Sequence, residues 1–128
     1  MMNNNTCPCG SARNYSDCCG KIHSGREAAQ DAEALMRARY SAFALQNIDF
    51  IYNTFHPTTR RFQNKKEIAT WAQACKWIHL EIIRSTVNTV EFKAHYLDEE
   101  GQPHIHHEKS SFKMLNKQWF YVDGKIFA

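Results

Sequence analysis

The segment VEFKAHY, residues 90–96, alternates apolar and polar side chains, and this period of two is typical of a β-strand with one buried face. Residues 77–82 alternate in the same way, and residues 104–115 and 118–122 predict two further strands. Three short segments carry turn signals: Asp98-Glu99-Glu100-Gly101, Asn116-Lys117 and Asp123-Gly124. Because short turns join antiparallel neighbours, we expect an antiparallel sheet.

Three helices are predicted ahead of the strands. Residues 26–47 place apolar side chains at three- and four-residue steps, and Asp31 is suited to cap this helix near its start. A short helix is expected over residues 48–55, and a third over residues 65–76, with Asn64 as its cap. Helices followed by antiparallel strands form an α+β pattern. We therefore expect about three N-terminal helices to cover one face of a strongly curved sheet.

The composition excludes several classes of protein. The 128 residues suffice for one ordinary domain, with 43% hydrophobic and 23% charged residues. No run approaches the ~20 apolar residues of a membrane helix. Residues 1–5 are polar where a secretory signal needs an apolar stretch, so a cytoplasmic protein without membrane contact is expected. The net charge of +3 is scattered along the chain, so a nucleic-acid partner is not expected.

Four of the five cysteines are clustered within residues 7–19: Cys7, Cys9, Cys18 and Cys19. In a reducing compartment, thiols at such spacing are typical of metal ligands, and zinc takes four of them. Two adjacent side chains rarely converge on one metal, so either a local turn brings in both Cys18 and Cys19, or His23 replaces one of them. The remaining alternative is a tail of free thiols. Cys75 stands alone and is expected to pack on a helix face.

The stretch Cys7-Pro8-Cys9-Gly10-Ser11, followed by Tyr15 and Cys18-Cys19-Gly20, resembles the SEC-C motif, which is the zinc-binding tail of the bacterial preprotein translocase ATPase. Ala12-Arg13 stands where that motif usually has Gly-Lys, but the ligands are intact. The resemblance implies Zn²⁺ as cofactor and residues 1–25 as a small zinc knuckle. Because the motif docks protein partners in the translocase, it also implies a docking role. Four thiolates around one zinc leave a charge of −2, which Arg13 and Lys21 are placed to offset.

Six segments after the cysteine cluster carry a second resemblance: residues 32–43, 54–60, 80–82, 90–92, 106–112 and 119–124. Through these segments the rest of the chain resembles the YchJ family, whose domain is similar to the nuclear transport factor 2-like (SnoaL-like) fold, a cone of sheet wrapped by three helices. The resemblance implies this α+β fold for residues 26–128, but it brings no established activity. Phe55 stands where the family often has Trp, and His79 where it often has Gly.

A cone of sheet offers a cavity for a ligand. His104, His106 and Glu108 share one face of their strand and could bind a transition metal, but the expected explanation is a polar hairpin end with one or two exposed histidines. A buried Glu108 needs a partner. We expect an ion pair from helix to sheet, with Arg37, Arg39 or Arg60 as the cation. The alternative is a general base, or a carboxylate that orients His56 or His107.

Three functions are compatible with these patterns. The favoured one is a zinc-stabilised binding or adaptor domain, with a protein partner at the knuckle. The second is a small-molecule enzyme of the isomerase or hydrolase kind, with Glu108 and a histidine as acid and base. The third is a nucleic-acid or ribosome-associated module, because Arg13, Lys21 and Arg26 add positive charge near the knuckle. The expected ligand-binding residues of the cone are Tyr40, His56, Arg60 and Glu108.

Overall fold

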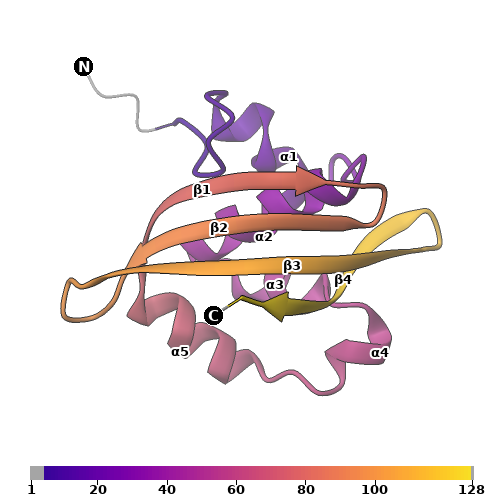
Figure 1. The fold of residues 1–128 in the computed structure, drawn as a ribbon. Coiled ribbons are helices and arrows are strands. Elements are labelled where there is room, and N and C mark those ends of the chain that lie inside the picture. Colours follow the sequence, from indigo (N-terminus) through magenta and orange to yellow (C-terminus); the bar gives the residue numbers. More distant parts are fainter. Residues whose placement is uncertain (1–4, 128) are drawn as a thin grey trace.

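A four-stranded antiparallel sheet forms the centre of the protein in the computed structural model, which describes residues 5–127 (Figure 1). The strands follow one another in the order β1-β2-β3-β4, so each pair of neighbours is a hairpin. The polar segment of residues 1–5 is the reason to expect no secretory signal. Of this segment, the structure describes only residue 5. The strands are β1 (Lys76–Ser85), β2 (Thr89–Leu97), β3 (Pro103–Leu115) and β4 (Gln118–Ile126).

The predicted strands are confirmed, but one of the predicted turns is wrong. Asn116 and Lys117 have positive φ values of 52° and 66°, as a tight hairpin turn requires. Asp123-Gly124, in contrast, lies inside β4, where Gly124 pairs with Ser110 of β3. A Cβ at residue 124 would overlap the carboxylate of Glu108. The glycine therefore permits a close approach between β4 and a side chain of β3, rather than a turn.

In the described part of the chain, six helical segments accompany the sheet. The long helix begins at the Asp31 cap rather than at residue 26, because the Asp31 carboxylate accepts the N–H of Ala34. The Asn64 side chain accepts two N–H groups at the start of the last helix. The segments are η1 (Tyr15–Asp17), α1 (Cys19–His23), α2 (Ala32–Leu45), α3 (Ile48–Asn53), α4 (Pro57–Arg60) and α5 (Lys65–Ala74).

The placement predicted for Cys75 is wrong. Helix α5 ends at Ala74, and Cys75 follows it with extended backbone angles. Its side chain is only half-buried and joins none of the core clusters. Cys75 therefore belongs to the connection between α5 and β1, not to the packed face of the helix.

The helices cover one face of the sheet, and Figure 1 shows α2 behind β1 and β2 with α5 along the lower side. The main core joins Leu35, Met36 and Tyr40 of α2 to strand residues such as Phe92 and Phe112, all at most 6% exposed. Burying each such side chain stabilises the fold by about 1.5–3 kcal/mol. Bulges in β1, and at Val122 of β4 opposite Ser111 and Phe112 of β3, bend the strands. The expected α+β fold with a curved antiparallel sheet is confirmed. Within residues 5–127 no helix combines the length and apolar character that crossing a membrane requires.

Candidate metal centre and cone pocket

The four clustered cysteines converge on one point. Their Sγ atoms all lie within 4.8 Å of one another, and each residue is at most 9% exposed. The first pair sits on a tight turn, in which the Gly10 N–H donates to the Cys7 carbonyl oxygen at 3.3 Å. The second pair lies where α1 starts, because Cys18 is the residue before the helix and Cys19 is its first residue. The abrupt change of backbone direction at Cys18 is the local turn that lets two adjacent side chains converge.

His23 is engaged elsewhere. The hydroxyl of Tyr15 lies 2.6 Å from its Nδ1, and the carbonyl oxygen of Ala38 lies 2.7 Å from its Nε2. Its ring also packs against Phe50, with 4.5 Å between the ring centroids. Both ring nitrogens therefore have partners away from the sulfur atoms, and His23 ties α1 to α2.

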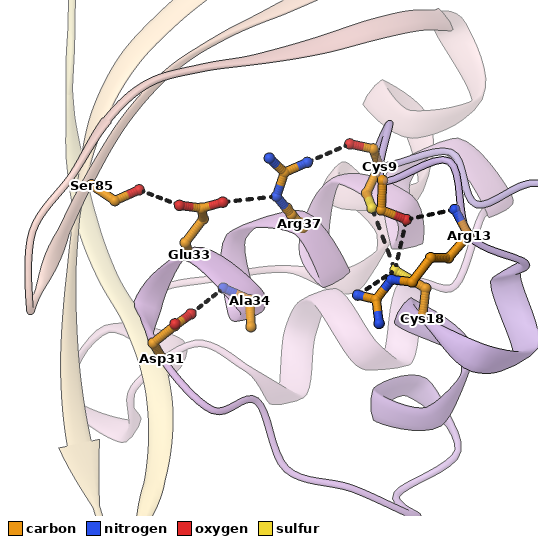
Figure 2. Close-up of polar contacts among 9 residues, drawn as sticks. Cys9, Arg13, Cys18, Asp31, Glu33, Ala34, Arg37 and Ser85 are labelled. Atoms are coloured by element: carbon orange, nitrogen blue, oxygen red, sulfur yellow. Dashed lines mark hydrogen bonds and ion pairs between the residues drawn. The ribbon is translucent and has the colours of Figure 1, made fainter.

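Hydrogen-bonding side chains from α2 and from the loop of residues 11–13 surround the sulfurs. The hydroxyl of Ser41, on α2, lies 3.5 Å from Cys7 Sγ, and that of Ser11 lies 3.1 Å from Cys18 Sγ. Arg13 donates from Nη2 to Cys18 Sγ at 3.6 Å (Figure 2). Of the two predicted cations, Arg13 thus approaches a sulfur, whereas Lys21 pairs with Glu27.

Ser41 and Arg37 are the residues of this centre that sequence reasoning missed. Ser41 is fully buried on α2, in the apolar stripe that holds Ala38 and Ala42. A single hydroxyl in such a stripe is the only sequence signal that could have pointed to it. Arg37 donates from Nη1 to the carbonyl oxygen of Cys9 at 2.8 Å.

The thiols influence one another strongly. Hydrogen bonds from Cys19 and Cys9 hold the pKa of the Cys7 thiol well below its usual range. The same contacts with Cys7 and Cys9, together with burial, raise the pKa of Cys19. The four thiols thus cannot all ionise freely, because four buried thiolates would repel one another. A divalent cation removes this repulsion, so the cluster could hold a metal ion.

A pocket of about 450 Å³ lies between the sheet, α2 and α5. Of the four residues predicted to bind a ligand, Tyr40 and Glu108 line it, and His56 and Arg60 do not. His56 caps α4 by accepting the N–H of Thr58. Arg60 donates to the carbonyl oxygen of Asn53. Because this pocket remains open, the aromatic side chains do not fill the interior of the cone.

The predicted ion pair between Glu108 and an arginine is wrong. Glu108 accepts three hydrogen bonds instead, from His106 Nε2 at 2.7 Å, Ser110 Oγ at 2.6 Å and Tyr121 Oη at 2.7 Å. Burial raises the pKa of Glu108, but the three donors outweigh burial and hold that pKa below its usual value. The carboxylate is therefore ionised at neutral pH.

The three candidate arginines have other partners. Arg37 pairs with Glu33, and Arg60 lies outside the pocket. The buried Arg39 donates from Nη1 to the Ile51 carbonyl oxygen and to Thr54 Oγ1. The Arg39 guanidinium carbon lies 4.5 Å and 4.4 Å from the ring centroids of Phe55 and Tyr121.

The histidines of β3 do not form the suggested metal site. His104 turns to Asp98 in the hairpin, with 2.7 Å between Nε2 and the carboxylate, while His106 faces Glu108. His107 pairs with Glu91 on the other face of the strand, so Glu108 orients His106 rather than His56 or His107. Within residues 5–127, the four cysteines are the only group of side chains placed to share a metal ion.

Comparison with known proteins agrees with both resemblances. The SEC-C motif matches residues 4–21, and the YchJ middle NTF2-like domain matches residues 31–124. A UPF0225 protein of Bordetella pertussis is 44% identical over 127 residues, covering 94% of this chain and 92% of that protein. A UPF0225 protein of Haemophilus influenzae is 38% identical over 125 residues, covering 94% of this chain and 77% of that protein.

Two solved structures share the fold. The solution structure of a SEC-C motif containing protein from Rhodopseudomonas palustris superimposes with a TM-score of 0.88 at 32% identity, covering 99% of this chain and all of that one. The crystal structure of a SEC-C motif containing protein from Psychrobacter arcticus gives a TM-score of 0.81 at 31% identity, covering 98% and 84% of the two chains. The chain belongs to the YchJ family, also named UPF0225, with a SEC-C motif ahead of an NTF2-like domain.

Proposed function

We propose that this protein is a zinc-binding adaptor in which Cys7, Cys9, Cys18 and Cys19 hold one Zn²⁺ ion. The observation that carries the proposal is the spacing of the buried sulfurs. A tetrahedral site with Zn–S bonds of ~2.3 Å has sulfur–sulfur edges of about 3.8 Å. The Sγ atoms of Cys9 and Cys18 are 3.6 Å apart. An all-sulfur set favours zinc over harder cations such as Mg²⁺ or Ca²⁺, and thiols kept reduced for the metal fit the cytoplasm.

The cation is expected to stabilise the knuckle rather than the whole fold. The cluster that contains the cysteines includes Ala38 of α2, whereas the main core between α2 and the sheet contains no cysteine. The second apolar cluster, around Ile51, contains none either. The NTF2-like domain therefore has a core of its own. In this proposal the metal keeps the knuckle folded and packed against the domain.

The role as an adaptor is supported by how the knuckle is presented. One side packs on α2 through Ala38 and Ser41, while Gly10, Ala12 and Arg13 on the other side are partly or fully exposed. A rigid, exposed loop with a basic side chain suits docking to a protein partner, because little conformational entropy is lost on binding. In this proposal the metal supplies the rigidity.

The test of the metal is elemental analysis of the purified full-length chain. We expect about one zinc per chain, which follows from one four-sulfur site. Cys9→Ser is expected to lose the zinc, and Cys75→Ser, which changes the cysteine outside the cluster, is expected to keep it. A chain that retains no zinc, or a Cys9→Ser variant that binds zinc as the parent does, would contradict the proposal.

The test of the adaptor role separates docking from stability. Chelation of the metal is expected to change the amide NMR signals of residues 5–25 and to leave those of β1–β4 in place. Partner proteins captured by the parent chain should be lost with Cys9→Ser and retained with Cys75→Ser. If the sheet unfolds on chelation, the metal is a structural element of the whole domain and the adaptor role is not supported.

A further inference from the structure

The pocket of the cone contains a second arrangement of chemically active side chains, remote from the cysteines. His106 and Glu108 lie two residues apart on β3 and line the pocket with Trp71 of α5 and Trp77 of β1. Trp71 is 38% exposed, which is unusual for such a large apolar side chain. Its ring centroid lies 5.8 Å from that of His106 and 5.1 Å from that of Trp77.

The hydrogen bonds around Glu108 determine which ring nitrogen of His106 donates a hydrogen bond and which one accepts. An ionised carboxylate only accepts, so His106 must donate its Nε2–H to Glu108. In the neutral imidazole the other nitrogen, Nδ1, is then an acceptor. Within residues 5–127, Nδ1 of His106 has no hydrogen-bond partner. A molecule that meets His106 in the pocket must therefore offer it a hydrogen-bond donor.

The charges of the pocket favour a cation. Among residues 5–127, three carboxylates line it, those of Glu67, Glu108 and Asp123, against one guanidinium, that of Arg39. Burial lowers the pKa of Arg39 to about 10, so this guanidinium stays charged at neutral pH. However, it lies against the rings of Phe55 and Tyr121 and is only 4% exposed. The Arg39 charge is thus largely covered, whereas Glu67 and Asp123 are exposed.

The walls of the pocket are aromatic. Phe43, Trp71 and Trp77 meet edge to face or tilted, with ring centroids 5.1–5.5 Å apart. The faces of indole rings attract ammonium groups, most strongly where water is excluded. Apolar side chains such as Met36 and Ile68 complete the lining and suit a hydrocarbon body.

We propose that this pocket binds a small organic amine in its ammonium form, with an apolar or aromatic body. The ammonium donates to Nδ1 of His106 beside the face of Trp71, and the body lies against Trp77 and Phe43. Glu108 is a positioning residue, because it holds His106 in the tautomer that accepts. The site uses none of the cysteines, so it does not depend on the proposed zinc function.

The test uses three probes of similar shape and different charge, phenethylamine, phenethyl alcohol and phenylpropionate, added to the full-length chain at neutral pH. Binding is followed by tryptophan fluorescence and by the NMR signals of the Trp71 indole and the His106 ring. We expect phenethylamine to bind with a Kd on the order of millimolar or tighter, as fits a ligand of this size. The alcohol should bind at least about tenfold more weakly, because it lacks the cation–π attraction.

Variants locate the binding. His106→Leu should weaken phenethylamine binding at least about tenfold, because the acceptor and its contact with the charge are lost. His104→Leu is the matched control, since His104 is on the same strand but turned to Asp98, and it should bind as the parent does. Trp71→Leu, at a half-exposed position, should also bind phenethylamine more weakly. This second variant keeps the test valid if His106→Leu does not fold.

Three results would overturn the proposal: no saturable binding of phenethylamine, binding of phenylpropionate as tight as that of the amine, or unchanged affinity in the folded variants of His106 and Trp71. Tight binding of the carboxylate would show that Arg39, not His106, sets the ligand class. The Cys9→Ser variant distinguishes this site from the zinc proposal, because it should lose zinc and still bind phenethylamine.

Discussion

Arg37 of α2 connects the knuckle to the domain by donating a hydrogen bond from Nη1 to the carbonyl oxygen of Cys9 at 2.8 Å. Figure 2 shows that the contact is part of a longer chain. The Arg37 Nε donates to Glu33 at 3.0 Å, and the other Glu33 oxygen accepts the hydroxyl of Ser85 at 2.7 Å. Three elements, the knuckle, α2 and the end of β1, are thus joined by one run of polar contacts.

Replacing Arg37 is expected to loosen the knuckle. In Arg37→Met the apolar stem is kept, but the hydrogen bond to Cys9 and the ion pair with Glu33 are lost. We expect the free energy of unfolding in urea to fall by about 1–3 kcal/mol, the usual cost of losing charged hydrogen bonds. Arg84→Met, on an exposed side chain of β1, is the control and should leave stability nearly unchanged. Equal stability of the two variants would show that the contact contributes little.

Ser41 is expected to tune the affinity for the metal. Its hydroxyl lies 3.5 Å from Cys7 Sγ in a fully buried position, and a donor to a ligating sulfur helps to disperse the negative charge. Ser41→Ala should therefore bind zinc about tenfold more weakly, measured by competition with a chromophoric chelator. Ser24→Ala, which changes a serine bonded to the Lys21 carbonyl oxygen instead, serves as the control. An affinity equal to that of this control would exclude a role for Ser41.

The elements of the fold could be predicted from local patterns because each depends on near neighbours in the chain. The alternation over residues 90–96 arises because a strand buries one of its two faces. The side chains of Asp31 and Asn64 cap their helices by accepting N–H groups at most three residues further on. The turn wrongly expected at Asp123-Gly124 arises where a distant element overrides the local signal. Gly124 serves a contact with Glu108 on another strand, which no local rule contains.

The sites could be predicted only in part, for the same reason. The cysteine spacing identified the cluster that could hold a metal ion, because all its members lie within residues 7–19. The partners of Glu108 could not be derived, since β4 supplies Tyr121 from thirteen residues further along and the bulge at Val122 of β4 sets its register. The alternation of β3 correctly placed His106 and Glu108 on the same face of the strand, but it could not show that His106 and Ser110, rather than an arginine, would donate to the carboxylate.

The close approach of β4 to Glu108 can be tested by adding one methyl group. In Gly124→Ala the new Cβ would overlap the Glu108 carboxylate, so either the strand or the side chain must move. We expect a loss of about 1–3 kcal/mol of unfolding free energy, as for other overpacked sites. In a Glu108→Ala background the same change should cost much less, because the obstructing side chain is gone. Equal costs in the two backgrounds would show that the overlap is relieved elsewhere.

Glu108 is expected to make the fold sensitive to acid. Its pKa in the folded protein is below its usual value because three groups donate to the carboxylate, so folding favours the ionised form. The resulting stability is fully present above the unfolded pKa of about 4.3 and is lost as the pH falls through the lower folded pKa. Glu108→Gln cannot ionise, so urea unfolding of this variant should show a smaller dependence on pH below about 4.3.

The parent and Glu108→Gln carry the same cysteines, so any zinc released by acid affects both, and the difference between their unfolding free energies isolates Glu108. That difference should be largest at neutral pH, because the amide offers one acceptor where the carboxylate has two, and it should shrink as the carboxylate protonates. A difference that stays constant down to about pH 3 would mean that folding leaves the Glu108 pKa unchanged, so that the three donors do not favour the ionised form. A difference that instead grows as the pH falls from neutral towards about 4.3 would mean that Glu108 is protonated in the folded protein at neutral pH. In that case His106 would no longer be held as a donor to Glu108, and its Nδ1 would not be fixed as an acceptor in the pocket.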